Sequence, residues 1–96
     1  MIKIYDGNLA IKLLCTIRDN HVYGDGEKIL YTISGDKVYE GEYALRDKLI
    51  YTVAGNKVYN GGHVIEERLK YTISGNKVYE GAYTIPSMLK YTMVEE

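Results

Sequence analysis

Apolar and polar residues alternate along short segments of this chain, and similar segments return at a fixed spacing. Segments such as "LIYTV" (49–53) and "LKYTI" (69–73) are rich in β-branched and aromatic residues, with a polar threonine between apolar neighbours. This alternation is typical of half-buried β-strands. Turn residues recur between the segments, and nothing between them has a helical period. The pattern therefore predicts an antiparallel meander of about eight to ten short strands.

The joint "SGNK" (74–77) indicates a tight hairpin. Gly75 stands at the first central position and Asn76 at the second, as a type II′ turn requires, because that turn needs a positive φ at the glycine. A two-residue turn places Ile73 opposite Val78. A three-residue loop would exchange the two faces of the hairpin, so this register depends on the turn length.

A second kind of joint separates one hairpin from the next. It reads "RD" (46–47), "EE" (66–67) or "PS" (86–87), and Pro86 suits the fixed φ of a type I turn. A glycine also follows each "VY" pair, and we expect it to lie inside the next strand as a bulge or a close backbone approach. These glycines are Gly41, Gly61 and Gly81.

The hairpins form an internal repeat with a period of 20 residues. The regular units are 31–50, 51–70 and 71–90, a half-unit follows at 91–96, and degenerate units occupy 3–30. The chain begins with the second half of a unit, "KIYDG" (3–7), and ends with the first half, so we expect these halves to pair and close the array. Residues 1–96 then form one all-β domain of repeated antiparallel hairpins that share a core.

Composition and charge exclude several classes of partner and site. Twelve basic and thirteen acidic residues give a net charge of −1 with no basic stripe, which argues against nucleic acid as a partner. No segment is apolar for long enough to span a membrane, and the N-terminus lacks the design of a signal peptide. The single cysteine, Cys15, cannot form an internal disulfide, so we expect a reducing, cytoplasmic location.

The aromatic residues are all tyrosines, eleven of them, and the repeat sets them in rows. The first row is Tyr31, Tyr51, Tyr71 and Tyr91; the second is Tyr23, Tyr39, Tyr59 and Tyr79; a partial third is Tyr43 and Tyr83. Aliphatic residues with matching parity flank the first row, so we expect that row in the core. The second row fits either cross-strand pairing with threonine or an exposed surface that stacks on a partner.

Candidate chemistry is sparse. Cys15 occupies a tyrosine slot of the repeat, His21 a lysine slot beside a turn, and His63 the slot of Tyr43 and Tyr83. A Cys15–His21 pair would need an orienting third group, and none is evident. No spacing of Cys, His or carboxylates suits a metal, and no helix start follows the Gly-rich turns to bind a phosphate. We therefore expect no enzyme, no metal and no cofactor.

Two families share these motifs. The alternation "YTI-x-G-N-x-VY-x-G" resembles small bacterial proteins described as four-fold β-flower domains, over residues 3–93. That resemblance implies short antiparallel hairpins repeated around a centre, with no established activity. The segment "VYEGEY" (38–43) is also similar to the MORN repeat, which implies a scaffold for proteins or lipids. The period of 20 is shorter than that of MORN arrays, and glycines are missing from "ALRDKL" (44–49).

These observations lead to two functional expectations. The first is a small non-catalytic structural or interaction module that self-associates through exposed tyrosines, with a protein or a carbohydrate as a further partner. The candidate surface is Tyr39, Tyr59, Tyr79, Tyr43 and Tyr83. The alternative is a ligand-binding module for a carbohydrate or another flat polar ligand, in which a tyrosine row is the stacking platform. A repeated site of that kind predicts a stoichiometry above one.

Overall fold

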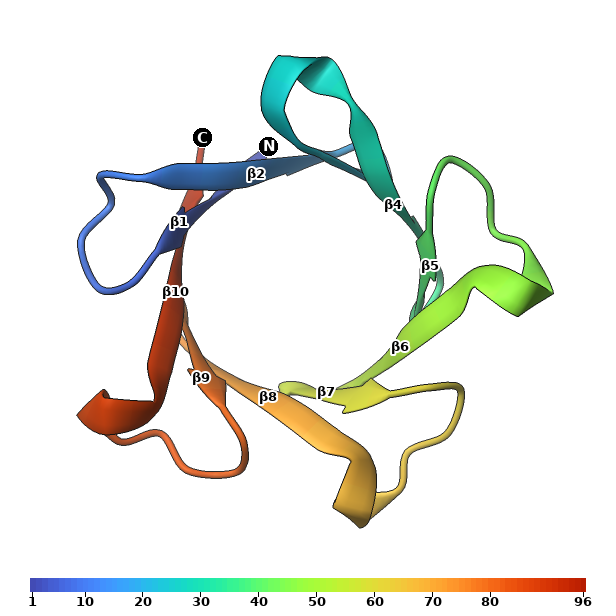
Figure 1. Cartoon of the computed structure of the whole chain (residues 1–96). Helices are drawn as coiled ribbons and strands as arrows, with labels where there is room; N and C mark the ends of the chain where they lie inside the picture. The colour runs from blue at the N-terminus through green and yellow to red at the C-terminus, as the bar shows by residue number, and fades with distance from the viewer.

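Ten antiparallel strands form a closed ring in the computed structural model, which describes residues 1–96 (Figure 1). The strands are β1 (Ile2–Asp6), β2 (Leu13–Arg18), β3 (His21–Tyr23), β4 (Ile29–Ser34), β5 (Lys37–Glu40), β6 (Leu49–Ala54), β7 (Lys57–Asn60), β8 (Leu69–Ser74), β9 (Lys77–Glu80) and β10 (Leu89–Glu95). Each strand pairs with its neighbours in sequence, and β1 pairs with β10. The ring is a flat disc of 35 × 34 × 16 Å. The predicted all-β meander is confirmed.

The tight turns follow from their glycines. Gly75 has φ +61°, and Ser74 lies opposite Lys77 across a two-residue turn. Ile73 consequently pairs with Val78, which confirms the predicted register. The hairpin of β2 and β3 instead turns through Asp19 and Asn20, which both have positive φ, as in a type I′ turn.

The first and last strands close the ring, as the split repeat predicts. Ile4 lies opposite Met93 in the ladder between β1 and β10. At the end of this ladder the Glu96 N–H donates to the Met1 carbonyl at 2.8 Å, and Lys3 forms a 3.1 Å ion pair with Glu96. The pair of β10 and β1 therefore takes the place of a fifth hairpin, and the expected four-fold repetition is wrong. The fifth copy was visible in the sequence as the "KIYDG" half-unit.

Longer connections leave the ring as outward loops (Figure 1). They contain the short 3-10 turns η1 (Asp25–Glu27), η2 (Arg46–Lys48), η3 (Glu66–Arg68) and η4 (Pro86–Met88). Pro86 opens η4, and the Met88 N–H donates to the Ile85 carbonyl at 2.9 Å, so the turn predicted at this joint is confirmed. None of these three-residue turns could span a membrane.

The glycines after each "VY" do not lie inside the next strand, and that prediction is wrong. Each one ends a strand and begins an outward loop, where Gly41 has φ +86°. The bulges lie elsewhere: Val38 pairs with Tyr51 and Tyr39 with Leu49, which leaves Ile50 without a partner on β5. The same shift recurs in every ladder between neighbouring hairpins, at Leu14, Leu30, Lys70 and Lys90.

The most buried side chains are threonines on the outer wall of the ring. Thr52 is 1% exposed, and its hydroxyl donates to the Gly61 carbonyl at 2.7 Å. The loop backbone thus covers the threonine and also satisfies its hydroxyl group. The equivalent bonds join Thr32 to Gly41, Thr72 to Gly81 and Thr92 to Gly7.

One unit departs from this arrangement because its loop is short. Only 16 residues separate Cys15 from Tyr31, against 20 in each regular unit. Thr16 occupies the threonine slot of this unit, but it is only half-buried and its hydroxyl has no hydrogen bond to a loop carbonyl. The outer wall of the ring is therefore open beside β2.

Candidate functional site

A cavity of about 330 Å³ lies at the centre of the ring. Its lining residues come from six strands around the circle, so the cavity must lie on the ring axis. They are Ile4, Leu14, Cys15, Leu30, Tyr31, Tyr51, Tyr71 and Tyr91. We call the last four the inner tyrosines. Every lining residue is aromatic, aliphatic or a cysteine, so the cavity is apolar apart from the phenol hydroxyls.

The bulges explain how the wall is built. Leu30 and Tyr31 are consecutive, yet both line the cavity, because the bulge at Leu30 interrupts the normal alternation of sides. Leu14 and Cys15 repeat this arrangement in β2. Tyrosine residues therefore face inward in four units, and the fifth unit presents the much smaller Cys15.

The first tyrosine row was expected to lie in the core, and only its inward orientation is confirmed. The row faces the interior, as its parity predicts, but its members are half-buried around a cavity and do not fill a closed core. A barrel of eight strands is just narrow enough for side chains to fill, and ten strands enclose a wider centre. The width of the ring thus leaves the rings of the inner tyrosines accessible.

Two of the inner tyrosines, Tyr71 and Tyr91, are in ring contact, and Tyr71 also lies near a cation. The rings of Tyr71 and Tyr91 meet edge to face, with centroids 5.9 Å apart and planes at 65°. The Lys70 ammonium lies 5.2 Å from the centroid of the Tyr71 ring. This distance is within the range of a cation–π interaction.

The environment of the cavity holds these phenols in their neutral form. Burial raises the pKa of Tyr71 well above its usual range, and the adjacent Tyr91 raises it further. Burial also raises the pKa of Tyr31, with smaller contributions from Tyr51 and Glu40. The hydroxyl groups therefore remain hydrogen-bond donors at neutral pH.

Alkaline pH is expected to destabilise the ring through these two phenols. Because the folded pKa values of Tyr31 and Tyr71 are raised, the folded state holds both protons more tightly than the unfolded chain does. Burial raises the pKa of Cys15 as well, so the free energy of unfolding should begin to fall above about pH 8.5, the unfolded pKa of cysteine. It should fall more steeply above about pH 10, the unfolded pKa of tyrosine. Urea unfolding between about pH 8 and pH 11.5, with tyrosinate absorbance recorded in parallel, measures this. Tyr71→Phe should flatten the slope; an unchanged slope would contradict the assignment.

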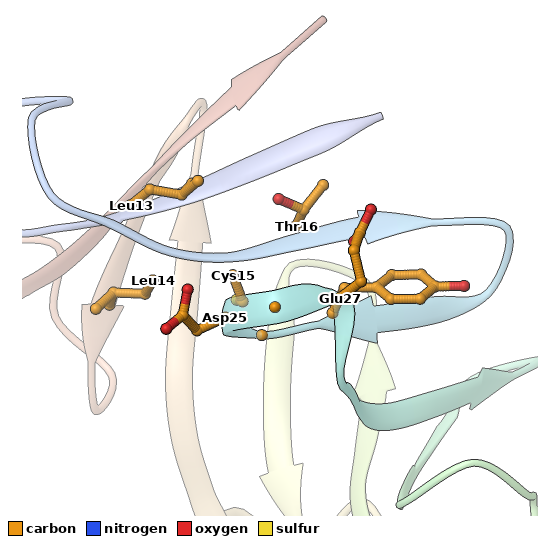
Figure 2. Close-up of a pocket in the computed structure, with 9 residues that line it drawn as sticks. Leu13, Leu14, Cys15, Thr16, Asp25 and Glu27 are labelled. Carbon is orange, nitrogen blue, oxygen red and sulfur yellow. The ribbon is translucent and has the colours of Figure 1, made fainter.

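A second, outer cleft of about 610 Å³ lies beside β2 (Figure 2). It is lined by Leu13, Leu14, Cys15, Thr16, Tyr23, Gly24, Asp25, Gly26 and Glu27. The cleft exists because the short loop around η1 leaves this part of the outer wall uncovered. Leu14 and Cys15 line both hollows, so these two residues stand between the cavity and the cleft.

The five tyrosines proposed from the sequence as an interaction surface do not share one face. Tyr39 lies opposite Thr32 on the outer wall and is half-buried, and Tyr59 and Tyr79 repeat that position. The other two lie on outward loops: Tyr43 is 65% exposed and Tyr83 72%. The second row therefore pairs with threonine across strands, one of the two alternatives that the sequence left open.

Cys15 and His21 are not brought together. His21 lies opposite Arg18, three residues along β2 from Cys15. Residues at odd spacing on a strand point to opposite faces, and Cys15 faces inward, so His21 points outward. Its ring contacts Tyr23 instead, at 6.1 Å between centroids. Burial raises the pKa of Cys15, which keeps the thiol protonated and weakly nucleophilic.

The closed ring of hairpins, with outward loops and a central cavity, defines a class of small repeat proteins in which one β-hairpin is copied around an axis. Residues 4–96 match the family described as 6-fold beta flower protein, so the chain belongs to that family. The β-flower resemblance is thereby confirmed, although the ten strands of this chain form four hairpins and one pair of terminal strands, and not six hairpins. No curated protein and no solved structure matches the chain.

Proposed function

We propose that this protein is a non-catalytic binding module whose central cavity holds one small, flat, mainly apolar ligand. The observation that carries the proposal is the convergence of the inner tyrosines on a single cavity. Its volume of about 330 Å³ suits a small molecule, because ligand pockets start at roughly 300 Å³. Tyrosine rings offer flat apolar faces for stacking, and their hydroxyls can orient a polar edge of the ligand.

The geometry changes the expected stoichiometry. A row of separate stacking sites predicts several ligands per chain, whereas rings that face one cavity predict one. The sequence left open which tyrosine row forms the stacking platform. The inner tyrosines are the better candidates, because only they enclose a common space.

The repeat itself supplies a variant that tests this proposal. Cys15→Tyr places a fifth ring in the slot that holds tyrosine in the other units, and the added ring would occupy part of the cavity. We expect the wild type to bind the neutral probe N-phenyl-1-naphthylamine with one site per chain, measured by its fluorescence. Cys15→Tyr should weaken binding by about tenfold or more, whereas the control Cys15→Ser should not. Equal binding by both variants would place the probe elsewhere and refute the proposal.

A second candidate function is self-association, and the outward loops favour it. Large apolar side chains gather there in exposed positions, at Leu9, Ile11, Tyr43, Leu45, Val64, Ile65, Tyr83 and Ile85. Large exposed apolar groups that recur on the loops of a small protein favour contact with a partner. Their arrangement around the rim would allow each loop to contact another copy.

Multi-angle light scattering tests this candidate. We expect the wild type to form a defined oligomer, and the double variant Tyr43→Ser/Tyr83→Ser to shift it toward monomer. His63 occupies the same slot in the loop between β7 and η3. His63→Ser is therefore the matched control and should leave the mass unchanged. A wild type that is monomeric at all concentrations would refute self-association.

A further inference from the structure

The aromatic walls of the cavity are suited to a cation. A tyrosine ring carries partial negative charge on its face and attracts a cation within about 6 Å of its centroid. Four such rings line one space, so a cation on the axis could contact several of them together. The chain already uses one of these rings in this way, because the Lys70 ammonium lies 5.2 Å from the Tyr71 centroid.

Charged residues at the mouth of the cavity add to this preference. Directly opposite residues of an antiparallel pair share a face of the sheet, so the partners of the inner tyrosines stand at the same mouth. Tyr31 pairs with Glu40, and Tyr71 with Glu80. Asp6 pairs with Tyr91 in the same way. We call Asp6, Glu40 and Glu80 the mouth carboxylates.

Two lysines stand beside the mouth carboxylates, and their positive charges offset part of the negative charge there. Lys70 and Lys90 occupy bulge positions next to Tyr71 and Tyr91. Neither lysine forms an ion pair. Lys12 lies at this end as well, because its carbonyl accepts from the Asp6 N–H at 2.9 Å. The mouth carboxylates therefore act as local counter-charges opposite three of the inner tyrosines. Two of these carboxylates also act electrostatically on the phenols opposite them, because Glu80 contributes to the raised pKa of Tyr71 and Glu40 to that of Tyr31.

We propose that the ligand of the central cavity carries an apolar cation, a quaternary or methylated ammonium group, held among the inner tyrosines with the mouth carboxylates as counter-charge. This inference rests on the proposed function and names the ligand class of that same site. A methylated ammonium suits an apolar cavity because its charge is spread over methyl groups that need no hydrogen-bond acceptors. An ordinary ammonium would lose its bonds to water there at a high cost.

A pair of probes that differ only in charge tests the inference. Acetylcholine and 3,3-dimethylbutyl acetate have the same shape, but the second has a carbon in place of the cationic nitrogen. Titrations followed by NMR of ¹³C-labelled tyrosine rings should show acetylcholine binding about tenfold or more tightly, with shifts centred on the inner tyrosines. Equal affinity of the two probes would overturn the cation inference while leaving the binding function standing.

Three variants locate the bound cation. Tyr51→Leu removes one aromatic face and keeps an apolar wall, so it should weaken acetylcholine by about threefold or more. Tyr51→Phe retains the face and should bind as the wild type does, which controls for the substitution itself. Glu80 is exposed, so Glu80→Gln should fold normally and still weaken acetylcholine but not its neutral analogue. A charge preference that none of these changes alters would place the cation elsewhere and overturn the inference.

The outcomes separate the two proposals. If N-phenyl-1-naphthylamine binds in the cavity and acetylcholine does not, the binding function stands and the ligand class is wrong. If neither probe binds, the proposed function fails together with the inference.

Discussion

Deletion of residues 1–6 is expected to abolish the cooperatively folded monomer. The deletion removes β1, which pairs with both β10 and β2, and so it opens the ring at two ladders at once. It also removes Ile4 from the cavity wall. Two unpaired strand edges would then face solvent, and such edges pair with other chains. Light scattering should show large aggregates, and thermal unfolding followed by circular dichroism should lose its sigmoidal transition.

A circular permutant is the matched control for this deletion. The chain ends are adjacent, since the Met1 amino group donates to the Glu96 carbonyl at 3.1 Å. Joining them through a Gly-Asn turn and opening the chain between Gly35 and Asp36 retains every strand of the ring. This permutant should remain folded. A truncated chain that unfolds as cooperatively as the permutant would show that closure of the ring contributes little.

Replacement of Thr52 by valine is expected to cost about 1–2 kcal/mol of the free energy of unfolding. Valine has nearly the same shape, so the change removes the buried hydroxyl and leaves the part-buried Gly61 carbonyl without its donor. For a domain of this size each kcal/mol lowers Tm by roughly 4–8 °C. Calorimetry or thermal circular dichroism would measure the shift.

The short-loop unit provides the control. Thr16 occupies the same slot, but its hydroxyl donates to no loop carbonyl and its side chain is half-buried. Thr16→Val should therefore change Tm by far less than Thr52→Val does. An equal decrease in Tm for both variants would mean that the bond from the threonine hydroxyl to the loop carbonyl is not the cause of the stabilisation.

The hairpins and the closure of the ring were predictable because their signals are local or repeated. Gly75 fixes a turn through its positive φ. The complementary half-units at the two chain ends indicate that these ends pair. The bulges gave no such signal. The same bulge position holds Leu30, Ile50 and Lys70, so no residue type marks it. A bulge bends its strand, so its value lies in the curvature of the closed ring, which a single unit does not show.

The candidate site was missed for a related reason. Alternation along a strand correctly predicted that Tyr31 and its equivalents face inward, but whether they fill a core depends on the number of strands around the axis. Cys15 was noticed as an exception in a tyrosine slot. Its consequence, a position between the cavity and the outer cleft, also depends on the short loop of that unit.

Because each hairpin contacts only its two neighbours, the number of copies determines the width of the central cavity. Barrel diameter grows roughly in proportion to strand number, so duplicating residues 51–70 in place would widen a ten-strand ring by about a fifth. A gene that gains or loses one 20-residue unit would thus change the width of the central cavity in a single step, with no substitution in the unit itself.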